Sequence, residues 1–164
     1  EFDGRLPTTT MAFEAGTEGQ GTIDIADGST TFEIYGQALA IYASLNDTGV
    51  WVSAADDATG LPEPGQNVIL LDSNAPTTEW SGATAFSVEV VGGLKSTLPS
   101  NTPVAFTRGL QTSGFWAAND TTVDGTGVYG NAGGVVGFLG GNVSFFENME
   151  ERFTNVSTGA PTSP

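Results

Sequence analysis

The sequence predicts an α+β domain in which one amphipathic helix packs on an antiparallel β-sheet. Three observations support this class: one stretch with helical spacing of apolar residues, several short apolar runs between turn residues, and a glycine-bounded hairpin pattern near the end. Long Gly/Thr-rich loops connect these segments. We expect a single globular domain over residues 1–153 and a flexible Ser/Thr/Pro tail over residues 154–164.

The helix is predicted over residues 30–45 from the spacing of its apolar side chains. Ser29 or Thr30 is a suitable N-cap, and Glu33 lies three residues after Thr30, as in a capping box. The sequence Asn-Asp-Thr-Gly at residues 46–49 ends the helix. We expect its apolar stripe to lie on the sheet; the stripe consists of Phe32, Tyr35, Leu39 and Tyr42, joined by Ile34, Ala38, Ile41 and Leu45.

The middle of the chain is predicted to alternate between short extended segments and loops. Residues 50–52 begin an extended segment, 56–66 form a Pro/Gly loop, 67–71 are rich in β-formers, and 72–81 form a polar loop. In residues 85–91 the apolar residues alternate, which favours a strand, with a short helix as the alternative.

The last third is predicted to hold a strand, a long loop and a hairpin. The strand is residues 103–107, and the loop is residues 109–132. In residues 133–146, Gly140-Gly141 suits a two-residue turn with positive φ angles. The layer facing the helix is expected to come from Val104, Phe106, Val136, Phe138, Val143 and Phe145.

Composition excludes several classes of function. The chain has 19 Asp and Glu against 4 Lys and Arg, for a net charge of −15, which excludes phosphate backbones and anionic membrane surfaces as partners. It has no Cys and no His, which excludes zinc sites of the usual kind, thiol catalysis and Ser-His-Asp triads. Glu147, Glu150 and Glu151 follow the last strand and are expected to face solvent, so we do not expect an enzyme.

Calcium is the one cofactor that the sequence suggests, although none is required. Asn119, Asp120, Asp124 and Asn131 fall in one glycine-rich loop, and calcium takes six to eight oxygen ligands of this kind. The spacing is not that of an EF-hand loop. The alternative is that these residues are turn formers, which Asn and Asp commonly are.

Five aromatic residues, spread from the middle of the chain to the long loop, allow two interpretations. They form a sugar-stacking platform, or they cap the core beneath the loops, and the second interpretation is favoured. The residues concerned are Trp51, Trp80, Trp116, Phe115 and Tyr129.

Two stretches resemble the globular domains of type IV pilin-like proteins and type II secretion pseudopilins. Residues 2–7, Phe-Asp-Gly-Arg-Leu-Pro, are similar to the step by which that family passes from its N-terminal helix into the globular domain. Residues 102–110, 127–134 and the hairpin through Asn148 are similar to the family's C-terminal region. The chain departs from that pattern at Val135, Gly140 and Asn142, where relatives carry His, Asp and His.

The resemblance implies a structural subunit of an extracellular pilus-like or pseudopilus filament. The chain would be the soluble head domain, without the apolar N-terminal helix that anchors the precursor in the inner membrane and packs in the filament core. Its partners would be further copies of itself, other pilins or secretion components, with no nucleic acid. The alternative is a secreted carbohydrate- or calcium-binding β-rich module, with residues 109–132 as the binding face.

Overall fold

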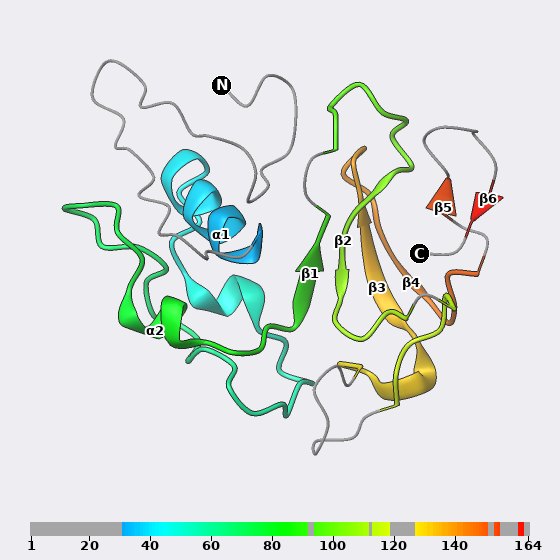
Figure 1. Cartoon of the computed structure of the whole chain (residues 1–164), viewed down its shortest axis with the longest axis horizontal. Helices are drawn as coiled ribbons and strands as arrows, with labels where there is room; N and C mark the ends of the chain where they lie inside the picture. The colour runs from blue at the N-terminus through cyan, green and yellow to red at the C-terminus, as the bar shows by residue number, and fades with distance from the viewer. Residues whose placement is uncertain are drawn as a thin grey trace.

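The computed structural model describes residues 31–91, 94–111, 113–118 and 127–150, together with the backbone of residues 153–154 and 161–162 (Figure 1). Within these residues there is one four-stranded antiparallel sheet, and only one helix is longer than seven residues, so the chain is α+β or mostly β. In chain order the elements are α1 (Thr31–Tyr42), the 3₁₀ helix η1 (Thr48–Trp51), α2 (Thr78–Gly82), β1 (Val88–Val90), β2 (Pro103–Thr107), the 3₁₀ helix η2 (Gly130–Ala132), β3 (Gly134–Phe138), β4 (Val143–Phe146), β5 (Phe153–Thr154) and β6 (Pro161–Thr162).

The main sheet has its strands in the order β1-β2-β3-β4, and every neighbouring pair is antiparallel. Val90 lies opposite Ala105, and Ala105 lies opposite Gly137, so these residues share one face of the sheet. Phe106 lies opposite Val136, and both belong to the other face. The register of β2 shifts between Pro103 and Ala105, which places Val104 at a bulge.

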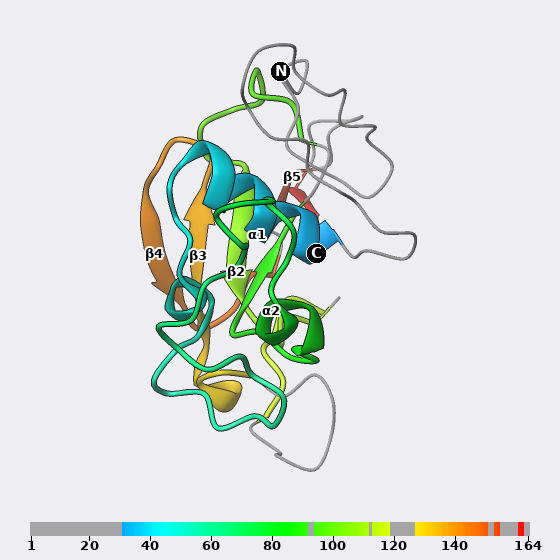
Figure 2. The same ribbon diagram turned by 90° about the vertical axis from the view of Figure 1, so that its left-hand side faces the viewer.

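Two hydrophobic cores lie on opposite faces of this sheet. The helix-side core consists of Tyr35, Ala40, Trp51, Val68, Ile69 and Trp80, and the sheet contributes Val88 and Val90 to it. The Trp116 core consists of Trp116, Val136 and Met149, with Phe106, Phe138 and Phe146 packed against it. Figures 1 and 2 show α1 and α2 beside β1, while β4 lies at the other end of the strand order.

The predicted helix is confirmed, but it ends at Tyr42, earlier than expected. Ser44 adopts a positive φ of 57°, and the N–H of Leu45 donates to the carbonyl of Leu39, so the chain turns out of the helix. Tyr42 and Leu45 are exposed, so the predicted stripe does not continue to its end. The side chain of Phe32 and the predicted caps lie outside the described residues.

The predictions for residues 50–52 and 72–81 are wrong at two short helices. Residues 48–51 form η1 because the Asp47 side chain caps it, accepting from the N–H of Gly49 at 2.7 Å. Residues 78–82 form α2 because Thr77 caps it and Trp80 is fully buried. In both cases one tryptophan anchors a helical turn that is too short to show periodicity.

The run of β-formers at residues 67–71 is extended but makes only an isolated bridge between Ile69 and Pro76. The side-chain amide of Asn46 replaces a neighbouring strand here. Its oxygen accepts from the N–H of Ile69 at 2.8 Å, and its nitrogen donates to the carbonyl of Ile69 at 3.1 Å. The residue expected to end the helix therefore also holds Ile69 in the helix-side core.

The C-terminal hairpin is confirmed, but its predicted turn and its predicted core face are wrong. The loop has three residues, because the N–H of Phe138 donates to the carbonyl of Asn142 at 2.9 Å, and only Gly141 has a positive φ, of 85°. This register places Phe145 opposite Val135 rather than Val136. A shift of one residue exchanges the faces of a strand, so Phe146 packs on the Trp116 core while Val143 and Phe145 are exposed.

The strand over residues 103–107 is confirmed, and the alternation in residues 85–91 yields β1. At the expected boundary between domain and tail, Phe153–Thr154 pairs with Pro161–Thr162 of the tail as a small antiparallel sheet.

The contact between Gly36 and Trp80 gives the first prediction. A Cβ atom at Gly36 would lie 2.0 Å from the Trp80 ring, so Gly36→Ala should lower the free energy of unfolding by about 2 kcal/mol through overpacking. Gly82→Ala is the matched control, since a Cβ there meets nothing within 4 Å, and it should leave stability unchanged or slightly raised. Urea unfolding followed by tryptophan fluorescence measures both; equal stability of the two variants would contradict the close packing.

Candidate functional site

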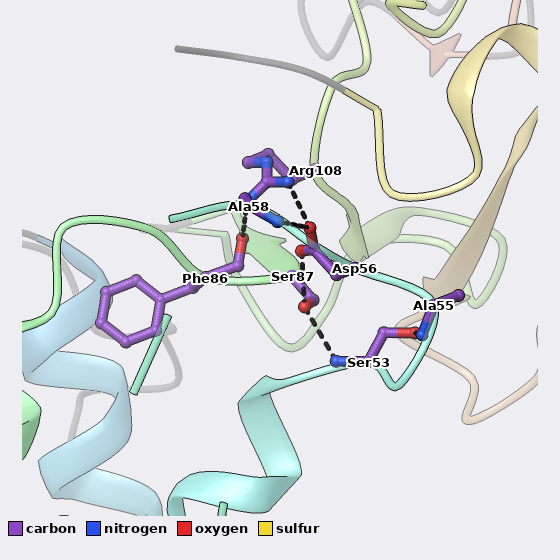
Figure 3. Close-up of polar contacts among 7 residues, drawn as sticks. All are labelled: Ser53, Ala55, Asp56, Ala58, Phe86, Ser87 and Arg108. Atoms are coloured by element: carbon purple, nitrogen blue, oxygen red, sulfur yellow. Dashed lines mark hydrogen bonds and ion pairs between the residues drawn. The ribbon is translucent and has the colours of Figure 1, made fainter. Parts of the chain in front are cut away.

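A buried polar cluster joins the loop before residue 60 to strands β1 and β2 (Figure 3). The Arg108 guanidinium contacts the Asp56 carboxylate at 2.7 Å, and these side chains are only 10% and 3% exposed. The other oxygen of Asp56 accepts from the Ser87 hydroxyl at 2.7 Å. The backbone N–H of Ala58 donates to Asp56 as well, at 3.1 Å.

The surrounding backbone completes this cluster. Arg108 also donates from its guanidinium to the carbonyl of Phe86 at 3.3 Å, and its backbone N–H donates to the carbonyl of Ser87 at 2.9 Å. The Ser87 oxygen accepts from the N–H of Ser53 at 2.8 Å. Ser87 thus donates to a carboxylate that is itself paired with a guanidinium, so the polar groups of the cluster are bonded to one another. We call this arrangement the Asp56–Arg108 clasp.

Glu89 lies on β1 near this clasp. Burial raises the pKa of the Glu89 carboxyl above its ordinary value of 4.5, while the charge of Arg108 and a hydrogen bond from the Gly109 backbone partly oppose the shift. Glu147 and Glu150 are exposed, as expected, and Glu151 lies outside the described residues.

The predicted calcium ligands are mostly beyond what the structure describes. Asn119, Asp120 and Asp124 lie outside the described residues, and Asn131 is exposed in η2. Among the residues that are described, no three His, Cys, Asp or Glu side chains gather as a metal site. Calcium binding by this loop therefore stays a prediction.

The aromatic residues do not form one platform. Trp51 and Trp80 pack against each other in the helix-side core, with ring centroids 5.6 Å apart, while Trp116 is buried in the core on the other face. The core-capping interpretation is thus confirmed for the tryptophans. Phe115 and Tyr129 are exposed. Tyr129 meets Phe145 edge to face at 69°, which does not present a flat stacking surface.

The outer edge of the sheet, β4, is a surface that the sequence did not identify. The hydrogen bond from Phe138 to Asn142 fixes the ladder, and the alternation of an antiparallel pair then directs the N–H and C=O groups of Val143 and Phe145 away from β3. Among the described residues, β4 pairs with β3 alone. The side chains of Val143 and Phe145 are 66% and 52% exposed, so both the edge and one face of the strand are apolar and open.

Strand β4 itself carries no charged residue and no proline that would oppose pairing. Natural edge strands carry charges, prolines or bulges, and β4 has the sequence Val-Ser-Phe-Phe. Residues 125–146 contain no Asp, Glu, Lys or Arg, in a chain with 19 acidic residues. That uncharged stretch is visible in the sequence and is the signal by which the edge could have been identified.

The opposite edge of the sheet is occupied. The N–H of Ser87 donates to the carbonyl of Trp51 at 3.0 Å, and the Tyr35 hydroxyl donates to the carbonyl of Val91 at 3.3 Å. Strand β1 is therefore covered by η1 and α1, which leaves β4 as the open end of the sheet.

An apolar groove lies between the helices and the sheet. It has a volume of about 280 Å³ and is lined by residues of α1, η1, β1, β2 and the end of β3. None of its ten lining residues is charged. The groove was not predicted, because its walls come from segments far apart in the sequence.

Comparison of the chain with protein-family models, with curated proteins and with solved structures finds no match. Among the residues that the structure describes, no helix is both long enough and apolar enough to cross a bilayer.

Because the Asp56–Arg108 pair is buried, removing one of the two charges should strongly lower the free energy of unfolding. Asp56→Asn removes the carboxylate charge that contacts the buried Arg108 guanidinium and should lower the free energy of unfolding by about 3 kcal/mol. Asp57→Asn is the matched control, because Asp57 is its exposed neighbour, and it should change stability by less than about 0.5 kcal/mol. Denaturant unfolding measures both; similar small effects would show that the pair does not stabilise the fold.

Because Glu89 is partly buried, replacing it with a neutral residue should raise the free energy of unfolding by an amount that depends on pH. The pKa of Glu89 is raised in the folded state, so as pH rises from 4.5 the unfolded chain loses this proton at a lower pH than the folded chain does. The contribution of Glu89 to the free energy of unfolding therefore falls over this range until the folded-state pKa is passed. Glu89→Gln cannot lose that proton, so its stability relative to the parent should increase across this window. Exposed Glu63→Gln is the control, and a pH-independent difference for Glu89→Gln would refute the assignment.

Proposed function

We propose that this chain is a non-enzymatic structural subunit that assembles with further copies of itself. The main support for this proposal is the uncharged β4 edge, which pairs with β3 alone among the described residues. Its outward backbone groups and the exposed Val143 and Phe145 can accept an extended segment of a neighbouring subunit. The polar side chains of the Asp56–Arg108 clasp are bonded to one another, which supports a structural role for this cluster.

The charge distribution explains why this edge would be used. Two copies that each carry a net charge of −15 repel each other over most of their surfaces. Residues 125–146 carry no charge, so contact through this stretch brings no carboxylates together. Assembly through β4 thus combines backbone hydrogen bonds, apolar contact and the least repulsion.

The resemblance to pilin-like proteins gives this proposal its finer form. On that basis the chain is an α+β head domain of a pilus-like or pseudopilus filament, extracellular or at the cell surface, with an N-terminal helix in the filament core. Its head domains would then meet side by side, with β4 as one of the meeting surfaces. Other pilins or secretion components are further partners on this proposal.

The β4 edge gives a direct test of assembly. Sedimentation velocity over a range of concentrations should show reversible association of the parent protein. Val143→Lys and Phe145→Lys should each raise the dissociation constant at least about tenfold, because a charge on an edge strand opposes pairing. Leu71→Lys is the matched control, since Leu71 is 81% exposed in a turn, and it should leave association unchanged.

Two outcomes would contradict assembly through this edge. One is a parent protein that stays monomeric up to about 1 mM, which corresponds to less than about 4 kcal/mol of association. The other is equal weakening by the edge variants and by Leu71→Lys, which would attribute the effect to added charge in general.

The alternative function is a secreted calcium- or carbohydrate-binding module. Its ligands for calcium would be Asn119, Asp120, Asp124 and Asn131. Calorimetric titration with calcium separates the two proposals, because Asp120→Asn with Asp124→Asn would abolish calcium binding without affecting association through β4. A saccharide array serves the same purpose for sugars.

A further inference from the structure

The apolar groove between α1, η1 and the sheet is open to solvent on one side and has room for a small molecule. Protein interiors contain few voids bigger than a water molecule, and an apolar cavity of about 150 Å³ stays dry and binds benzene. The groove here has about 280 Å³, which is room for roughly twice that ligand.

The walls of the groove offer almost no polar partner. Leu39 of α1, Val90 of β1 and Ala105 of β2 line it with aliphatic groups. The one hydroxyl among its lining residues is that of Tyr35, and it already donates to the carbonyl of Val91 at 3.3 Å. Burial raises the pKa of Tyr35 to about 12, as expected of a phenol in apolar surroundings.

The groove has an accessible rim. Val50 of η1 belongs to the lining and is 48% exposed, so a small molecule can reach the groove from solvent. The bulge at Val104 brings a further apolar side chain into the lining, beside the end of β3 at Leu139. The groove is therefore formed where the helix-side elements stop covering the sheet.

Charge restricts the kind of ligand. Among the residues that the structure describes, no Lys or Arg lines the groove, and the chain as a whole carries a net charge of −15. An anion such as a fatty acid carboxylate would find no cation and would be repelled, whereas a neutral apolar molecule is free of both penalties.

We infer that this groove is a binding site for a neutral apolar small molecule of about two rings, such as an aromatic hydrocarbon or a neutral lipophile. The hydrophobic effect supplies the affinity, and the absence of cations sets the preference for neutral over anionic ligands. The printed lining of the groove contains no residue of β4, although it reaches the end of β3 at Phe138 and Leu139, and this inference does not rest on assembly.

A matched pair of fluorescent probes tests it. N-phenylnaphthylamine is neutral, and anilinonaphthalene sulfonate has the same ring skeleton with an added sulfonate. The neutral probe should bind the folded chain saturably with one site, and the sulfonate should bind at least about tenfold more weakly. No saturable binding of the neutral probe, or equal binding of both, would overturn the inference.

Two variants locate the site. Ala105→Phe places a ring in the groove and should weaken binding of the neutral probe at least about tenfold, whereas Ala132→Phe, at an exposed alanine of η2, should leave it unchanged. Circular dichroism and the thermal midpoint confirm that each variant is folded. Unchanged probe binding by folded Ala105→Phe would exclude this groove as the site.

Val50→Lys provides a test that does not depend on filling the groove. Val50 is half exposed at the rim, so the lysine can be accommodated, and its charge should raise the affinity for the sulfonate probe at least about tenfold. Leu71→Lys adds the same charge far from the lining residues and should not do so. Equal gains in both variants would overturn the charge argument.

Discussion

The three-residue loop of the C-terminal hairpin is the constraint on which the sheet depends. Gly141, at a φ of 85°, closes the loop at Phe138 and Asn142, and that closure fixes which residues of β4 face each side. With Phe146 directed to the Trp116 core, Val143 and Phe145 are left on the open face. One backbone conformation thus decides both what the core contains and which surface is available to a partner.

The rest of the fold is attached to this sheet mainly at β1. The helix-side core packs on Val88 and Val90, and the Asp56–Arg108 clasp holds the loop after η1 to the junction of β1 and β2. Among the described residues, α1 packs on β1, and between α1 and β2 lies the apolar groove. The groove and the open edge are two results of this uneven coverage.

Local patterns predicted the elements that have enough residues to show a period or a defined turn chemistry. Helix α1, strand β2 and the hairpin belong to this group. Helices η1 and α2 were missed because a capping side chain and one buried tryptophan form each of them, and neither leaves a repeating pattern. The core face of β4 was mispredicted because Gly140-Gly141 fits a two-residue turn as well as the observed loop. The clasp could not be predicted, since Asp56 and Arg108 are 52 positions apart and sequence spacing does not indicate their contact.

The Asp56–Arg108 clasp has a consequence for how this protein responds to ionic strength. The pair is shielded from solvent, so dissolved ions screen it little, whereas the repulsion among exposed carboxylates is reduced strongly by salt. For a chain with a net charge of −15, adding salt therefore relieves the main unfavourable electrostatic term and leaves the favourable one in place. We therefore expect the free energy of unfolding of this chain to rise with moderate salt, with the buried Asp56–Arg108 pair little affected.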